Sequence, residues 1–289
     1  MPLICLLAPA FACLNSYEEA ILYHQGRPDP KEAQEHRMEL EKQYARSSDH
    51  ETANDYAVAL LYVGESKKAI ALLQGIEKTH AGAYQTAANL GTAYELDGQD
   101  ALALAWIKEG VRRNPKDHAG TEWLHVKILE AKLAIKQNPG WLADNHVLGI
   151  GFGKGALPEM PSRLPVDFLG KQISLDEARL ALSHQLDERL KFVDPPDPVV
   201  GDLLLSWGDI AYLSGSDDFT PLYQSALRFG VGNGDLVKQR SSATYARWMV
   251  RFWFWPAFIL LSVAAFTAFR ISRRKKRQAK LRHSAGTQI

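Results

Sequence analysis

The chain has little cysteine, and both cysteines lie among its first residues. Only Cys5 and Cys13 occur in 289 residues, which excludes a disulfide-dense scaffold and a four-cysteine zinc site. Glycine and proline are too scarce for a fibrous protein, and an apolar fraction of 46% is too high for a disordered one. Segments in which apolar and polar residues alternate are almost absent, which predicts a helical protein. The length allows one or two domains with a buried core.

Acidic residues are missing from the last 20 residues of the chain. The net charge of +1 therefore hides an asymmetry, because eight lysines and arginines follow Phe269 and residues 1–269 carry a net charge of −7. An acidic body binds nucleic acid poorly, so we expect no nucleic-acid partner. The basic end either binds an anionic surface or flanks a membrane helix on its cytoplasmic side.

An uncharged run precedes the basic end. Residues 252–269 read FWFWPAFILLSVAAFTAF, and with residues 248–251 the run is long enough to span a bilayer. We expect a transmembrane helix over 248–269 and a basic cytoplasmic tail over 270–289; a buried core helix is the alternative. An aromatic belt and a basic cluster are expected to anchor this helix: Trp248, Trp253, Trp255, Arg273, Arg274, Lys275, Lys276 and Arg277.

The beginning of the chain is also apolar. Residues 2–14 read PLICLLAPAFACL, and Ala10-Phe11-Ala12 fits the small-residue pattern at a signal-peptide cleavage site. We predict a signal peptide over 1–12, although it lacks a positively charged n-region. A lipoprotein signal ending before Cys13 and an apolar helix that packs on the domain are the alternatives. A cleaved signal and an inward basic tail would give a single-pass protein of a bacterial inner membrane with a periplasmic N-terminal domain.

The middle of the chain repeats with a period of 34 residues. This shift aligns Gly64 with Gly98 and Ala69 with Ala103. Small residues let two antiparallel helices approach closely, and each glycine suits the left-handed end of a helix. The period therefore predicts two successive helix-turn-helix units.

The two units resemble the tetratricopeptide repeat family. Residues 84–117 fit best, through the run Asn89-Leu90-Gly91-Thr92-Ala93-Tyr94 and the later Gly98, Ala103 and Pro115, and residues 50–83 fit well except for the final proline. The resemblance implies an all-α solenoid of helical hairpins over 16–140. The next unit departs from the family pattern, because His125 stands where glycine is expected and Lys132 replaces the turn glycine, so one longer helix is predicted over 121–137. A loop rich in glycine and proline follows over 141–170, and further helices with a degenerate repeat follow over 171–240.

The resemblance also implies a groove that binds a partner protein or peptide. In the family, certain positions of each first helix face the concave side. These positions carry no lysine or arginine here, so an apolar surface with an acidic edge would suit an apolar or basic segment. The alternative is that the chain's own extra helices fill the groove. The mapped positions are Glu51, Asn54, Val58, Leu61, Tyr62, Gln85, Thr92, Glu95 and Leu96.

Patterns that carry catalysis are missing. The glycine-rich run over 149–155 lacks the spacing of a phosphate-binding loop, the histidines show no HExxH pair, and no G-x-S-x-G occurs. We therefore expect no catalytic residues, no cofactor and no metal. The leading hypothesis is a membrane-anchored scaffold or adaptor for protein–protein interaction. The alternatives are a tail-anchored adaptor with a cytosolic repeat domain, and an enzyme or enzyme subunit that uses the loop over 149–165.

Overall fold

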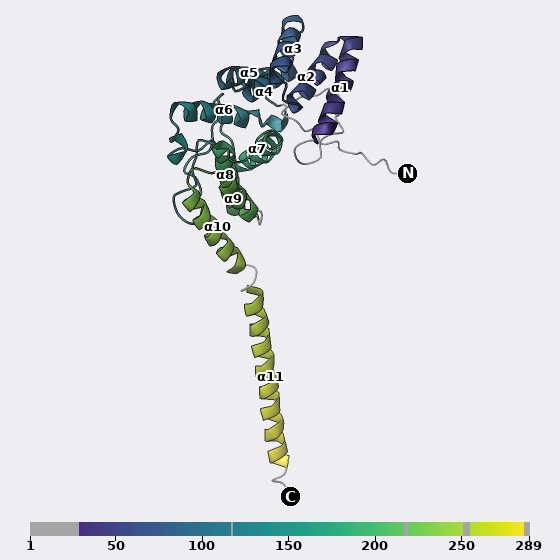
Figure 1. Cartoon of the computed structure of the whole chain (residues 1–289). Helices are drawn as coiled ribbons and strands as arrows, with labels where there is room; N and C mark the ends of the chain where they lie inside the picture. Colours follow the sequence, from purple (N-terminus) through teal and green to yellow (C-terminus); the bar gives the residue numbers. More distant parts are fainter. Residues whose placement is uncertain (1–28, 117, 217–218, 251–254, 286–289) are drawn as a thin grey trace, which may run out of the picture. The chain divides into compact units, whose positions relative to one another are not determined.

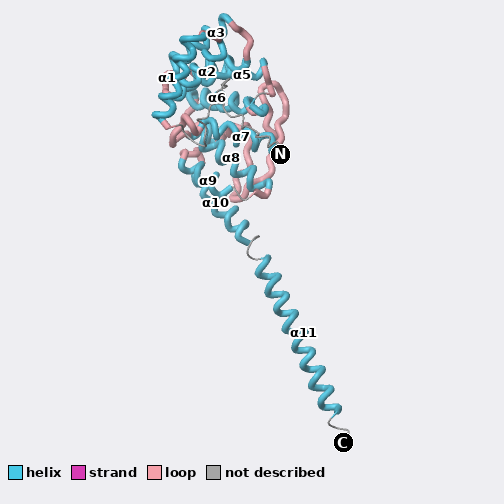
Figure 2. The backbone as a smooth tube through the Cα atoms, turned by 90° about the vertical axis from the view of Figure 1, so that its right-hand side faces the viewer, coloured by secondary structure: helices cyan, strands magenta, loops and turns pink. Residues whose placement is uncertain are grey.

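The computed structural model describes residues 29–116, 118–216, 219–250 and 255–285 (Figure 1). Within these ranges the chain consists of helices joined by loops and turns (Figure 2), with one isolated antiparallel bridge between Val166 and Gln172. The all-α class predicted from the sequence is confirmed for this part of the chain. The predicted signal peptide over 1–12 and the start of the predicted solenoid at residue 16 lie outside the described residues.

The chain divides into two compact units, Met1–Arg240 and Ser241–Ile289. We call the first the helical unit. Its helices are α1 (Pro30–Ser47), α2 (His50–Tyr62), α3 (Ser66–Thr79), α4 (Tyr84–Leu96), α5 (Asp100–Arg113), α6 (Glu122–Gln137), α7 (Leu175–Arg189), α8 (Pro198–Ser214), α9 (Phe219–Arg228) and the first turns of α10 (Gly234–Met249).

Two helical hairpins repeat with the period seen in the sequence. The bounds of α4 and α5 follow those of α2 and α3 by 34 residues at each end. The first helix of each hairpin ends at a glycine in the left-handed conformation, Gly64 with φ +77° and Gly98 with φ +78°. Their amides donate to the carbonyls of Leu61 and Glu95. Because glycine adopts this conformation without strain, these two residues fix the helix ends.

Successive helices from α1 to α6 pack against one another, and α2 also packs against α4. A hydrogen bond between Asn89 Nδ2 and Asn54 Oδ1, 2.9 Å long, joins these two first helices inside the core. The surrounding core is built from small and branched side chains, which let the helices approach closely. Its fully buried members include Ala57, Leu73, Leu90, Ala93, Ala103, Ile107, Val126 and Leu129.

Gly91 marks the closest approach within the second hairpin. A methyl group there would lie 3.1 Å from the Ile107 amide nitrogen and closer still to its side chain. We expect Gly91→Ala to lower the free energy of unfolding by about 1–3 kcal/mol through overpacking. In α3, Gly75 has open space where a Cβ would stand, so Gly75→Ala should raise the free energy of unfolding by about 0.5–1 kcal/mol. Urea unfolding of the full chain in detergent, followed by circular dichroism, measures both; equal effects would contradict this packing.

The unit after the second hairpin departs from the repeat. α6 runs from Glu122 to Gln137 without a break, one residue shorter than the predicted 121–137. A long loop then leads to α7, and the glycine-rich run over 149–155 lies in it (Figure 2). Buried Arg240 in α10 donates to the carbonyls of Phe152, Gly153 and Gly155. The run is therefore held to the helical unit by a guanidinium group.

The second unit contains α11 (Trp255–Ala285), and its Pro256–Lys276 part is long and apolar enough to cross a membrane. None of this stretch is buried; Leu260 and Leu261, for example, are each 70% exposed. The span differs from the predicted 248–269, because Trp248 belongs to α10. Pro256 sits in the first turn of α11, where its missing amide hydrogen costs least.

The expected anchor residues divide between the helices. Trp255 opens α11, and Trp253 lies outside the described residues. Cation–π contact joins Arg273 to Phe269, with the guanidinium 5.0 Å from the ring centre. The basic cluster belongs to α11, and the side chains described there are exposed: Arg273, Arg274, Lys275 and Lys276, with Arg277 next in the same helix.

Candidate functional site: a charged pocket between α4, α6 and α7

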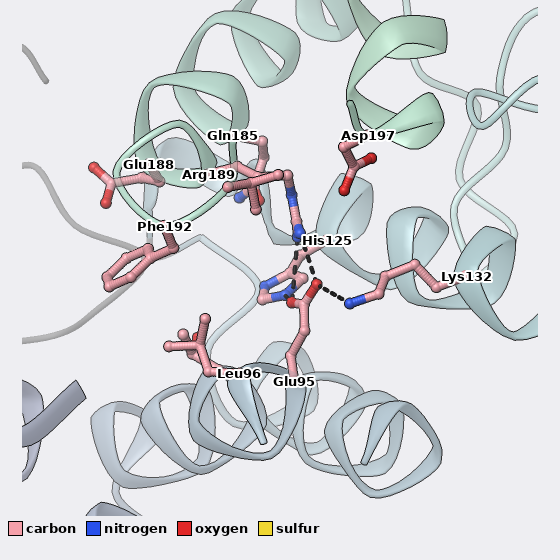
Figure 3. Close-up of a pocket in the computed structure, with 11 residues that line it drawn as sticks. Glu95, Leu96, His125, Lys132, Gln185, Glu188, Arg189, Phe192 and Asp197 are labelled. Atoms are coloured by element: carbon pink, nitrogen blue, oxygen red, sulfur yellow. Dashed lines mark hydrogen bonds and ion pairs between the residues drawn. The ribbon is translucent and has the colours of Figure 1, made fainter. Parts of the chain in front are cut away.

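A pocket of about 200 Å³ lies between α4, α6, α7 and the segment that follows α7 (Figure 3). One part of its wall is charged and another part is apolar. The cationic side chains come from α6 and α7, whereas α4 supplies the carboxylate of Glu95 on which they converge. The lining residues are Thr92, Glu95, Leu96, His125, Lys132, Gln185, Glu188, Arg189, Phe192, Val193 and Asp197.

Three cationic side chains converge on the carboxylate of Glu95 (Figure 3). Arg189 binds it through two nitrogens, with Nη1–Oε1 at 2.6 Å and Nη2–Oε2 at 3.2 Å. His125 Nε2 lies 2.7 Å from Oε2, and Lys132 Nζ lies 2.9 Å from Oε1. This group, which we call the Glu95 network, ties α4, α6 and α7 together. A bidentate guanidinium–carboxylate pair is among the stronger side-chain contacts.

The network continues on both sides of Glu95. Lys132 Nζ also lies 3.1 Å from a carboxylate oxygen of Asp100, at the start of α5. On the other side, His125 Nδ1 lies 3.4 Å from Glu122, whose second oxygen lies 2.7 Å from His118 Nδ1. Both ring nitrogens of His125 therefore face carboxylates, which favours the protonated imidazole because both of its nitrogens can donate.

The ionisation of these groups follows from their partners. Burial alone would raise the pKa of Glu95, but Arg189, His125 and Lys132 outweigh it and hold that pKa well below its usual range. Glu122 is likewise buried, yet hydrogen bonds from His118 and His125 lower its pKa. Burial would lower the pKa of His125, but the two glutamates raise it above the ordinary histidine value.

His125 should make the stability of the helical unit depend on pH. Because its pKa is raised on folding, its contribution is fully present below about pH 6.5 and is lost as the pH rises through the folded value. We expect the free energy of unfolding to fall between pH 6 and pH 9, and to fall less in His125→Gln. Urea unfolding at both pH values measures this, with His80→Gln, at an exposed position, as the control. Identical pH dependence in His125→Gln and the wild type would contradict the prediction.

The apolar wall of the pocket is partly open. Leu96 at the end of α4 is 37% exposed, and Phe192 stacks on Tyr62 with ring centres 5.1 Å apart. Thr92 is 7% exposed, and its hydroxyl has no hydrogen-bond partner among the described residues. A buried hydroxyl without a partner costs free energy, so this wall offers one polar group to an incoming molecule.

The nine groove residues named from the sequence have different environments. Thr92, Glu95 and Leu96 line the pocket together. Tyr62 packs on Phe192, Glu51 is exposed and Gln85 is half-buried. Core positions hold the other three, which present little surface to a partner: Asn54, Val58 and Leu61.

Sequence reasoning missed the residues that complete the site. His125 and Lys132 stand where the repeat pattern expects glycine. This departure is the sequence signal that marks these two positions. Arg189 lies 94 residues from Glu95, so no local spacing connects them. Among the described residues, no group of three or more histidines, cysteines or carboxylates could hold a metal ion.

The arrangement is chemically suited to binding and to holding helices together, because Glu95, His125, Lys132 and Arg189 all contact opposite charges. Comparison of the chain with protein-family models, with curated proteins and with solved structures found no match.

Proposed function

We propose that the chain is a membrane-anchored scaffold of the tetratricopeptide repeat type, which binds a segment of a partner protein and performs no catalysis. The observation that carries this proposal is the 34-residue period shared by the bounds of two helical hairpins. Hairpins stacked in this way leave a surface along their first helices for a partner. Three of the groove positions expected from the resemblance support the proposal, because Thr92, Glu95 and Leu96 lie together in the wall of the pocket at the end of α4.

The membrane part of the proposal rests on α11. Its unburied apolar stretch is long enough to span a bilayer, and the cations that follow it favour the cytoplasmic side. We infer that the helical unit lies on the non-cytoplasmic side, in a bacterial cell the periplasm. The tail-anchored alternative, with a cytosolic helical unit, would require eight cations to cross the bilayer.

Site-specific photo-crosslinking in living cells tests the binding role. A photoreactive amino acid at Leu96, in the pocket wall, should give discrete adducts of higher mass. The same amino acid at Leu102, which is 45% exposed on α5, is the matched control and should give none or different ones. The same adducts at both positions, or none at Leu96 and several at Leu102, would contradict a partner site at the pocket.

A further inference from the structure

The groove of the helical unit already holds two side chains of the chain itself. Arg189 donates two hydrogen bonds to the carboxylate of Glu95, and Phe192 stacks on Tyr62. The two are three residues apart, at the end of α7 and just after it. Their targets, Tyr62 and Glu95, lie in the last turns of the first helices of two successive hairpins. Residues 189–192 therefore contact both helical hairpins.

This internal occupant leaves part of the site unfilled. About 200 Å³ remains beside it, which is smaller than the usual cavity for a drug-sized ligand or cofactor and suits a single amino-acid side chain. Around this space lie the exposed edge of Leu96 and the hydroxyl of Thr92, for which the described residues supply no hydrogen-bond partner. Leu190, inside the same short segment, is 38% exposed. The segment therefore fills the groove less completely than a core helix would.

We propose that the groove recognises a partner segment with an arginine followed three residues later by an aromatic residue, and that residues 189–192 of this chain occupy the same two subsites until such a segment displaces them. Charge complementarity supports the arginine: the groove positions of α2 and α4 supply carboxylates and no cation, and a guanidinium fits a carboxylate in the forked geometry seen at Glu95. The aromatic subsite is the face of Tyr62. This inference rests on the proposed scaffold function and names its partner chemistry.

A peptide taken from the chain itself is the direct probe. A fluorescent peptide covering residues 184–196, HQLDERLKFVDPP, is titrated with the full chain in detergent micelles and followed by anisotropy. A tethered occupant competes at a high effective concentration. We therefore expect weak binding to the wild type, and at least tenfold tighter binding to the variant Arg189→Ala/Phe192→Ala, whose own occupant is truncated.

Two controls make the test specific. A peptide with alanine in place of its arginine and its phenylalanine should bind the truncated variant at least tenfold more weakly. The variant Arg179→Ala/Leu180→Ala changes an exposed arginine and an exposed leucine of the same helix and should bind the peptide like the wild type. If the double variant loses its helical circular dichroism, Phe192→Ala alone replaces it, because that variant keeps the Arg189–Glu95 pair.

Equal affinity of the wild type and the folded truncated variant would overturn the proposal, as would equal binding of the two peptides. Crosslinking at Leu96 tests the scaffold role separately. Adducts there without any peptide binding would refute the partner chemistry and leave the scaffold function standing. Absence of adducts together with tight peptide binding would refute the scaffold in cells and leave the two subsites standing.

Discussion

Asp209→Ala is expected to lower the free energy of unfolding by roughly 3–5 kcal/mol, because it leaves a buried guanidinium without its counter-ion. Asp209 in α8 forms an ion pair with Arg240, and the side chains are 2% and 1% exposed. The Tyr223 hydroxyl donates to the same carboxylate at 2.9 Å. Without Asp209, the Arg240 guanidinium and the Tyr223 hydroxyl stay buried and both lose this carboxylate as a partner.

The loss should extend to the glycine-rich loop. Arg240 donates to the carbonyls of Phe152 at 2.9 Å and Gly153 at 2.5 Å, so a displaced guanidinium would release that loop. Hydrogen exchange over residues 149–160 should therefore become faster in Asp209→Ala. Replacing both partners by apolar residues, as in Asp209→Leu/Arg240→Met, should recover part of the stability because no charge remains buried.

Urea unfolding of the full chain in detergent micelles, followed by circular dichroism, measures the stability change. Asp235→Ala is the matched control, because Asp235 pairs with Lys238 on the surface of α10 with its side chain 87% exposed. Such a surface pair contributes little, so this variant should unfold like the wild type. An effect of Asp209→Ala below about 1 kcal/mol, well short of the cost of breaking a buried pair, would refute the structural role of the pair.

The second large effect is expected for Glu95→Gln. The amide keeps the size of the side chain and removes the charge on which Arg189, His125 and Lys132 converge. Because the carboxylate is buried and its three partners would remain, we expect the free energy of unfolding to fall by roughly 3–5 kcal/mol at neutral pH. Arg189 should then hold α7 less firmly, and hydrogen exchange should accelerate in its last turn.

The pH dependence of this loss identifies its electrostatic origin. The pKa of Glu95 is held well below its usual range in the folded chain, so its contribution is present above about pH 4.5 and is lost as the pH falls through the folded value. The difference between the wild type and Glu95→Gln should shrink as the pH falls below about 4.5, because protonation of the carboxylate removes its pairing with the three cationic partners. Glu35→Gln, at an exposed glutamate of α1, is the control. A difference that does not shrink in acid would indicate lost packing.

The sequence predicts those parts of the fold that local chemistry determines. Gly64 and Gly98 end their helices because glycine tolerates the left-handed conformation, so both hairpins can be located from spacing alone. α6 could be predicted as one long helix, because Lys132 stands where the repeat would place a turn glycine. The start of the membrane helix differs from the predicted residue 248, because α10 extends to Met249 and Pro256 stands in the first turn of α11.

The site could be predicted only in part. The family pattern maps Thr92, Glu95 and Leu96 to the groove, and the structure places these three in one pocket wall. Arg189 and Phe192 could not be found in this way, because they reach the groove through a loop of more than 30 residues that no repeat pattern describes. Long-range ion pairs depend on tertiary packing, and a single sequence does not encode them in its spacing.

The side of the membrane on which the helical unit lies is measured by the topology of the chain. A reporter that is active only outside the cytoplasm is fused after Ser241 and, in a second chain, after Ile289, and the N-terminus of the mature protein is sequenced. We expect activity only for the fusion after Ser241 and a mature chain that begins at Cys13. Inactive fusions at both positions, with residues 1–12 retained, would place the helical unit in the cytoplasm and contradict the proposed orientation.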